Sequence, residues 1–249
     1  MDAVPERLRR AVSIPGAGGA SSGAALDFPH DDARRSDMTG ADTTGSGCGA
    51  IALLPAEEYR RERWPNGAGW TRQIASASEA GTGLLWRLSI AEITSEASYS
   101  LFHGLQRHQV LLQGDGIVLE LEGAPAQRAE PPFGQVSFPG ELPARCTLLG
   151  GPVHMFNLFH RPDRFDLSLW RRPVVGPMYF FPASGETWAM HLLSGQAELG
   201  GRGGGCMMQQ GDSALLGAAG GCPGRVSLEG GGEVLVARLT PRAPAGADS

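Results

Sequence analysis

Short apolar runs separated by glycine-rich turns recur along most of the chain. Between residues 84 and 91, Trp86, Leu88 and Ile90 alternate with smaller or polar residues. Strict alternation over eight residues is typical of a strand with one buried face. The run from Ile51 to Leu54 is a shorter strand of the same kind. This pattern predicts an all-β fold.

The stretch from Ser100 to Leu121 has the strongest local pattern. An apolar run, Val110–Leu112, is followed by the polar and glycine-rich residues 113–116 and then by an alternating run from Ile117. Glycine tolerates positive φ, so a Gly-Asp-Gly cluster between apolar runs predicts a β-hairpin.

A weak internal repeat points to two similar units. The residues Leu192–Gly195 resemble Leu111–Gly114 at an offset of 81 residues, and Gly232–Leu239 resembles Gly151–Leu158 at the same offset. Two separate matches at one offset indicate a duplicated unit.

The composition supports this division of the chain. The 37 glycines and 18 prolines favour strands and turns over helices. The first 48 residues contain few large apolar side chains, which predicts a disordered tail. We expect a first barrel over residues 49–165, a second and degenerate barrel over 166–240, and a frayed end over 241–249.

Charge and cysteine content exclude several classes of function. The net charge is −5 and the chain has no lysine, which argues against a nucleic-acid partner. No run approaches the roughly 20 apolar residues that span a bilayer, so no membrane partner is expected. The four cysteines form no Cys-x-x-Cys pair, which argues against zinc and favours reduced thiols in the cytoplasm; they are Cys48, Cys146, Cys206 and Cys222.

An ordered set of short motifs resembles the HutD/Ves family. In order they are Trp64-Asn66-Gly67-Gly69-Thr71, Trp86-Arg87-Ser89-Ala91, Phe102-Gly104-Arg107, Gly114-Gly116, Phe138-Pro139-Gly140, and Gly150-Gly151-Pro152 with Asn157. The resemblance implies a bicupin, two antiparallel β-barrels of the jelly-roll type. It also implies an association with bacterial histidine utilisation and no established catalytic activity.

The resemblance to cupins further implies where a metal would be held. With Gly114 as the turn glycine, the ligand positions of the first unit are Leu101, His103, Arg107 and the neighbourhood of Ala144. Only His103 is a residue type that commonly binds metals, and the guanidinium of Arg107 stands where metal-binding cupins have a carboxylate. We therefore expect neither a metal nor another cofactor.

Arg107 is the candidate centre of a binding site. A guanidinium pairs with a carboxylate through two parallel hydrogen bonds, and a buried one needs such a partner. The partner is either an internal acid, Glu92 or Glu120, or an acidic ligand.

The other candidate residues surround Arg107 in the expected barrel. His103, Arg87, Ser89 and Asn157 would add polar contacts, while Trp64 and Asn66 would close the mouth. Simpler roles stay open for them: a surface loop for His103, a solvated face for Arg87, packing for Trp64 and a turn cap for Asn66.

The function expected from these residues is non-catalytic binding of a small carboxylate metabolite. By the resemblance, this would be a histidine-degradation intermediate, such as urocanate or an acylated or formiminated glutamate, whose binding modulates histidine utilisation. One alternative is a metal-dependent isomerase or dioxygenase that uses His103, His108, His154 or His160. Another is a structural or interaction module with a filled barrel. The sequence leaves open whether the protein is a monomer or a homodimer.

Overall fold

The computed structural model describes residues 50–201, 204–217 and 224–243. The prediction of an all-β protein is confirmed, because these residues form strands and a single 3-10 turn, with no α-helix. None of them forms a helix long and apolar enough to cross a membrane. The predicted tail over residues 1–48, and residues 244–249 of the predicted frayed end, lie outside the described residues.

The elements occur in the order β1 (Ala50–Leu54), η1 (Ala56–Glu58), β2 (Arg60–Arg63), β3 (Gly69–Glu79), β4 (Gly83–Ile93), β5 (Ala97–Ser98), β6 (Gln106–Gln113), β7 (Ile117–Leu121), β8 (Ala124–Ala129), β9 (Gln135–Pro139), β10 (Ala144–Leu148), β11 (Val153–His160), β12 (Phe165–Val175), β13 (Met178–Phe180), β14 (Thr187–Gly201), β15 (Gly204–Gln209), β16 (Ser213–Gly217) and β17 (Val226–Pro241).

Two sheets make up the first unit, which we define as strands β2 to β11. A six-stranded sheet has the order β2-β3-β4-β11-β6-β9, and a four-stranded sheet has the order β5-β10-β7-β8. Ile93, Leu111 and Met155 of the six-stranded sheet pack with Leu119 and Cys146 of the four-stranded sheet in one buried cluster. Alternation along each strand directs these side chains into the space between the sheets.

The hairpin predicted between residues 100 and 121 is wrong, although both of its strands exist. β6 pairs with β11 and β9, whereas β7 pairs with β10 and β8 in the other sheet. The turn through Gly114 and Gly116, whose φ angles are 99° and 110°, therefore carries the chain from one sheet to the other. The local pattern predicts a turn, but only the core between the sheets decides the partners of each strand.

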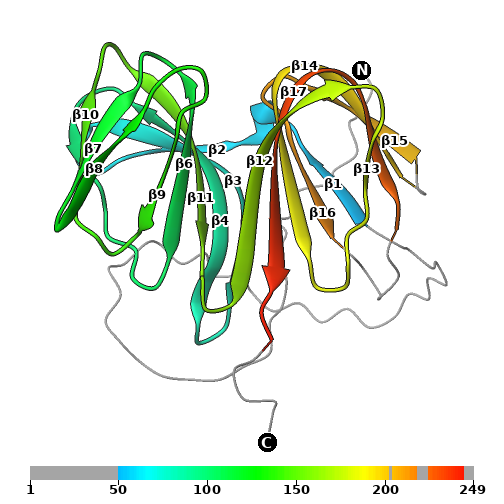
Figure 1. The fold of residues 1–249 in the computed structure, drawn as a ribbon, viewed down its shortest axis with the longest axis horizontal. Helices are drawn as coiled ribbons and strands as arrows, with labels where there is room; N and C mark the ends of the chain where they lie inside the picture. The colour runs from blue at the N-terminus through cyan, green and yellow to red at the C-terminus, as the bar shows by residue number, and fades with distance from the viewer. Residues whose placement is uncertain (1–49, 202–203, 218–223, 244–249) are drawn as a thin grey trace, which may run out of the picture.

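The second unit, β1 with β12 to β17, is built around two long strands, β14 and β17. The seven-stranded sheet has the order β1-β16-β14-β17-β12, with β13 beside β17 and β15 beside β14. β1 was predicted to begin the first unit, but it pairs with β16 at the edge of the second (Figure 1). Its apolar side chains Ile51 and Leu53 pack against the core of the second unit, and this packing decides its place.

The six-stranded sheet is buried on both faces. Its second face carries Leu88, Val110 and Phe156, which share a cluster with Leu215 and Leu235 of the second unit. The two units thus lie side by side, with the six-stranded sheet facing the second unit (Figure 1). Burial on both faces explains why Val110-Leu111-Leu112 is a continuous apolar run.

Closed barrels were predicted, but the structure shows three open sheets. The six-stranded sheet ends at β2 and β9, and the four-stranded sheet ends at β5 and β8. Hydrogen bonding therefore does not run continuously around either unit. The sheets of the first unit are held together by side-chain packing instead.

The two units share the same pairing pattern around their central strands. Leu111 pairs with Met155 and Gln113 with His154, so that Leu112 bulges out of the ladder. In the second unit Leu192 pairs with Val234 and Ser194 with Glu233, which makes Leu193 the bulged residue, 81 positions after Leu112. On the partner strands the equivalent residues are 79 positions apart, not the 81 read from the sequence. A shift of two keeps each side chain on the same face.

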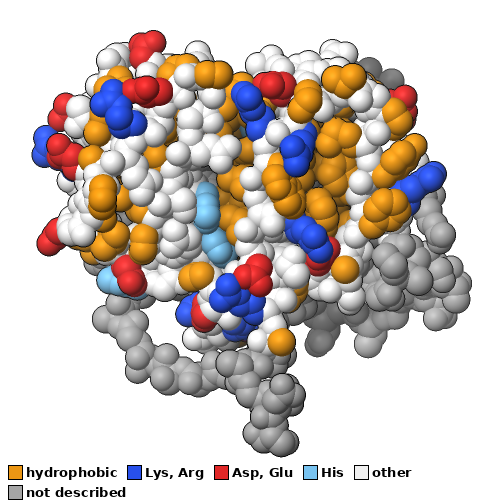
Figure 2. Space-filling view, in the orientation of Figure 1, with side chains coloured by type: hydrophobic (Ala, Val, Ile, Leu, Met, Phe, Trp, Pro, Cys, Tyr) orange, Lys and Arg blue, Asp and Glu red, His pale blue; other side chains and the backbone are white. Residues whose placement is uncertain are grey.

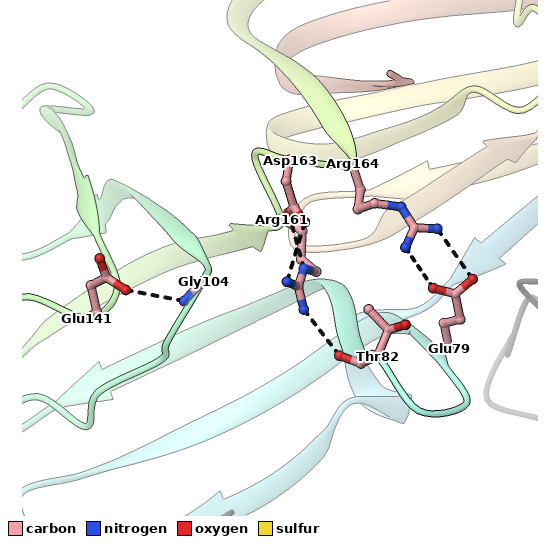
Figure 3. Close-up of polar contacts among 7 residues, drawn as sticks. All are labelled: Glu79, Thr82, Gly104, Glu141, Arg161, Asp163 and Arg164. Atoms are coloured by element: carbon pink, nitrogen blue, oxygen red, sulfur yellow. Dashed lines mark hydrogen bonds and ion pairs between the residues drawn. The ribbon is translucent and has the colours of Figure 1, made fainter. Parts of the chain in front are cut away.

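Charged side chains fasten the connection between the two units (Figure 3). Arg164 forms an ion pair with Glu79, at 2.8 Å from Nη1 to Oε2. Arg161 donates to the carbonyl oxygen of Thr82 and pairs with Asp163. These contacts tie the segment after β11 to the turn between β3 and β4.

The turn after β6 provides a test of this architecture. A Cβ atom on Gly114 would lie 2.7 Å from Pro152 O and 2.8 Å from Val153 Cγ1, at a φ of 99° that disfavours other residues. We expect Gly114→Ala to lower the free energy of unfolding by about 1–3 kcal/mol. The measurement is urea unfolding followed by circular dichroism.

Gly151→Ala is the matched control, because its Cβ would meet nothing within 4 Å. A Gly114→Ala protein as stable as the Gly151→Ala protein would contradict the close approach of β6 and β11 at this turn.

Candidate functional site

Three neighbouring strands bring four polar side chains together inside the first unit. Asn157 on β11 lies opposite Ser89 on β4 and opposite Gln109 on β6, and Arg107 lies two residues before Gln109. All four are at most 5% exposed. We call Arg107, Gln109, Asn157 and Ser89 the interior cluster. The expectation that Arg107, Ser89 and Asn157 face the same interior agrees with this register.

The side chain of Asn157 organises the interior cluster. Its Oδ1 accepts hydrogen bonds from Arg107 Nε at 3.0 Å, Arg107 Nη2 at 2.8 Å and Gln109 Nε2 at 2.9 Å. Its Nδ2 donates to the carbonyl oxygen of Met155. Asn157 is therefore fixed in the orientation that presents its acceptor to the guanidinium.

Aromatic rings surround the rest of the guanidinium. Arg107 Cζ lies 4.0 Å from the centroid of the Tyr99 ring, 5.0 Å from that of Phe159 and 5.7 Å from that of Phe138. Ring faces attract a cation, and the attraction grows when water is excluded. Burial nevertheless dominates and lowers the pKa of Arg107 to about 10.

No carboxylate pairs with Arg107 among the described residues. The predicted internal partners are occupied elsewhere, because Glu92 pairs with Arg61 and Arg72 and Glu120 is exposed to solvent. A neutral amide oxygen thus holds a cation that is only 5% exposed. The interior cluster has an excess positive charge.

Arg87 adds a second cation on the same face. It lies opposite Phe159 on β4, and Arg107 lies opposite the same residue on β6. Its Cζ is 5.5 Å from the Phe159 ring and 5.9 Å from the Phe102 ring, and its buried Nε has no hydrogen-bond partner within the described part of the chain. Burial lowers the pKa of Arg87 as well. The alternative that Arg87 lies on a solvated outer face is therefore wrong.

Sequence reasoning missed Gln109 and Tyr99. Gln109 could have been found, because it lies two residues after Arg107 on the same strand and so on the same face. Tyr99 comes from the edge of the other sheet, where its backbone N–H donates to Ala144 O. Its position in the sequence therefore gives no such signal. Burial raises the pKa of its hydroxyl above the ordinary value.

The predicted rim residues lie farther from Arg107. Trp64 packs edge-on against Tyr99, with ring centroids 6.4 Å apart, and donates from Nε1 to Thr71. Asn66 Oδ1 accepts a hydrogen bond from the Ala68 N–H, so Asn66 caps the turn, which was the simpler alternative for this residue. His103 is exposed in the loop before β6, and the structure records no contact between it and Arg107. Their roles at a ligand stay predictions.

The loop that carries His103 is held by the Phe-Pro-Gly turn. Phe102 N donates to Gly140 O at 2.8 Å, and Gly140 N donates to Leu105 O at 2.6 Å. Glu141 accepts from the Gly104 N–H at 3.4 Å (Figure 3). The two motifs are thus one structural feature at the end of the first unit.

A surface cavity of about 440 Å³ lies near the interior cluster. It is lined by Tyr99, Leu101, Glu120 and Arg145, among others, but not by Arg107. Tyr99 contacts Arg107 through its ring and also borders this cavity. Tyr99 is therefore the side chain that links the cavity wall to the guanidinium.

The second unit has no counterpart of the interior cluster. By the shared register, Arg107 corresponds to Trp188, Gln109 to Met190, Asn157 to Val236 and Ser89 to Trp170. Met190 and Val236 belong to one apolar core cluster, and the partly buried Trp170 and Trp188 pack against it. Polar groups at these positions are therefore not needed to form the fold.

His108 and His160 point to the face of the six-stranded sheet opposite Arg107. His108 and His160 stack with ring centroids 5.2 Å apart, and Figure 2 shows histidine surface in the crease between the two units. The described residues contain no group of three or more His, Cys, Asp or Glu placed to hold a metal ion. The metal-enzyme alternative finds no set of ligands in this part of the chain.

Comparison with known proteins identifies the family. The HutD family profile matches residues 56–236. The chain belongs to the HutD family. The structure of HutD from Pseudomonas fluorescens SBW25, described for a formate condition, has 30% sequence identity and a TM-score of 0.65; the match covers 78% of this chain and all of that one. This match also supports a cupin-like fold.

Two curated relatives agree with the assignment to the HutD family. An uncharacterized 21.2 kDa protein from the region 3′ of hutC in Pseudomonas putida is 42% identical over 120 residues, which is 48% of this chain and 63% of that protein. Protein Ves from Citrobacter koseri is 36% identical over 140 residues, which is 55% of this chain and 70% of Ves.

The unpaired charge leads to a prediction about stability. Asn157→Leu removes the acceptor and leaves a buried cation without a partner, so we expect the free energy of unfolding to fall by about 2–4 kcal/mol. Arg107→Met removes the charge and should leave the protein at least as stable as the parent. Urea unfolding of both variants and of the double variant measures these changes. Equal destabilisation by the two single substitutions would contradict this account of Arg107.

The buried histidines lead to a prediction about pH. Burial lowers the pKa of His108, His160 and His191 to about 4, below the ordinary value of 6.5. Protonation therefore favours the unfolded chain, and stability is lost as pH falls below 6.5. Each histidine should add a slope approaching about 1.4 kcal/mol per pH unit.

Urea unfolding at pH values between 6.5 and 5 measures this slope. His160→Gln should reduce the slope by the contribution of about one proton. Equal slopes for the parent and His160→Gln would show that His160 is not a neutral buried group.

Proposed function

We propose that the first unit binds a small carboxylate at Arg107 without catalysing its conversion. The observation that carries this proposal is a guanidinium that is 5% exposed and has no acid partner among the described residues. A buried charge is costly unless it is paired, and the second unit places tryptophan at the same position. An acidic ligand would supply the missing charge.

The geometry leaves donors free for such a ligand. The recorded hydrogen bonds of Arg107 use Nε and Nη2, both toward Asn157 Oδ1. A guanidinium has five N–H donors, so most of its capacity to bind a carboxylate remains. Arg87, on the other side of Phe159, would contribute a second positive charge.

The proposed roles of the remaining residues follow from their positions. Asn157 and Ser89 would orient Arg107 and contact the ligand, and His103 would approach from the loop before β6. Trp64 would close the site through its contact with Tyr99, and Asn66 would hold the neighbouring turn. Because the two units share one pairing pattern, we propose that they form a bicupin. The second unit would be the structural partner of the first.

Family relationships suggest the chemical identity of the ligand. The relative from Pseudomonas putida is named for its position beside hutC, and the Pseudomonas fluorescens HutD structure is described for a formate condition. A carboxylate intermediate of histidine degradation would fit this setting. Binding would then modulate histidine utilisation. The free thiols of Cys146 and Cys206 suit the proposed cytoplasmic location.

A second candidate function is a structural module whose first unit is filled by its own side chains. Two observations favour it: aromatic rings pack around Arg107, and Arg107 does not line the surface cavity of about 440 Å³. In that case Asn157 and the surrounding aromatic rings would stabilise the cation without a ligand. A binding measurement separates the two candidates.

Arg107→Gln tests the proposal. A charge-assisted pair contributes roughly 1.5–3 kcal/mol, so the substitution should weaken carboxylate binding by about one to two orders of magnitude. Titration calorimetry with urocanate, formylglutamate, formate and an unrelated acid measures the affinity. Arg128→Gln is the control, because Arg128 is exposed and pairs only with Glu130 among the described acids.

The result that would overturn the proposal is equal affinity in the Arg107→Gln protein and the parent. Failure of every acid to bind the parent would favour the filled structural module instead.

A further inference from the structure

A second cavity lies between the two units, on the opposite side of the six-stranded sheet from Arg107. Its volume is about 160 Å³, and both bulged residues, Leu112 and Leu193, line it. The equivalent irregularities of the two units therefore meet at one place. A bulge re-aims the neighbouring side chains, and bulges are frequent beside binding sites.

A buried chain of polar groups ends at this cavity. Tyr59 Oη lies 2.7 Å from Ser213 Oγ, and Ser213 Oγ lies 2.9 Å from His191 Nδ1. His191 is 3% exposed and lines the cavity, and burial lowers its pKa to about 4, so the ring is neutral. In the first unit the equivalent position holds Val110. The fold itself thus accepts an apolar residue here.

A cation also lines the cavity. Arg72 Nε is 2.7 Å from Glu92 Oε1, and the same carboxylate also holds Arg61. One carboxylate is shared by two guanidinium groups, and the charge of a further acid, Asp212, also acts on the His191 ring. No aspartate or glutamate lines this cavity.

The rest of the wall combines apolar side chains with the polar side chains of Gln113, His154 and Gln210, and it includes a strained residue. Phe133 lines the cavity with a φ of 56°, a conformation that is unfavourable for a bulky side chain. Strain of this kind persists where the surroundings impose it, and it concentrates at ligand sites. Leu112, Leu193 and Ile90 complete the apolar side.

We propose that this cavity between the units is a second ligand site, specific for a short-chain aliphatic monocarboxylate. The carboxylate contacts the terminal nitrogens of Arg72 and the Nε2–H of His191, while Ser213 donates to Nδ1 and fixes that tautomer. The aliphatic tail lies against Leu112, Leu193 and Phe133. Phosphate fits less well, because some of its charged oxygens would face Leu112, Leu193 and Phe133, which offer them no hydrogen bond.

This second site is independent of the proposed function at Arg107. The two lie on opposite faces of the six-stranded sheet, since Arg107 shares its face with Leu111 of the first core and Arg72 lines a cavity bordered by Ile90 and Leu112. Occupation of the second site would bridge the two units. A protein that lacks Arg107 therefore keeps the second site.

The test uses the full-length Arg107→Gln protein, in which the first proposed site is removed. Butyrate binding is measured by saturation-transfer NMR and by the rise in melting temperature, with inorganic phosphate compared at equal concentration. We expect saturable butyrate binding that weakens at least about tenfold on adding Arg72→Gln, and also weakens on adding His191→Val. Arg61→Gln is the matched control, because Arg61 shares Glu92 but does not line the cavity.

Leu112→Phe provides a second variant that narrows the space for the aliphatic tail and keeps both polar groups. It should abolish butyrate binding even if Arg72→Gln or His191→Val does not fold. The proposal is overturned if butyrate does not bind the Arg107→Gln protein, if Leu112→Phe or Arg72→Gln binds it unchanged, or if phosphate binds as tightly. Loss of all acid binding with Arg107→Gln alone would leave the proposed function standing and remove only the second site.

Discussion

Burial of the six-stranded sheet on both faces is the constraint on which the rest of the structure depends. One face packs on the four-stranded sheet and the other on the second unit. Most side chains of its central strands are therefore buried or half-buried, whichever way they point. A polar residue on β4, β6 or β11 must find a partner inside the protein or in a ligand. This makes the polar residues of these strands informative.

The two faces handle this constraint differently. Toward the four-stranded sheet, Asn157 Oδ1 accepts hydrogen bonds from Arg107 and Gln109 but supplies no negative charge. Toward the second unit, His191 is held by Ser213 and faces a cavity that Arg72 also lines. In both places the equivalent position in the other unit is apolar, Trp188 for Arg107 and Val110 for His191. Comparing equivalent positions of the two units thus separates the residues that the fold requires from those that a site requires.

The same comparison explains why the second unit is a suitable partner. Met190 and Val236, which stand for Gln109 and Asn157, complete an apolar core around the long strands β14 and β17. Such a core needs no ligand to be stable. The first unit keeps a buried cation near Tyr99 at some cost in stability.

The sequence by itself determined the strand content, the family and the residues of one face. Alternation along Trp86–Ala91 is a local property of the chain, so the face shared by Arg87 and Ser89 could be predicted. Strand partners are set by long-range packing, and for that reason β1 was placed in the wrong unit and β6 was wrongly paired with β7. Tyr99 reaches Arg107 across two sheets, and no spacing in the sequence encodes that contact. Only the tertiary structure could decide that the guanidinium has an amide and aromatic rings around it instead of an acid.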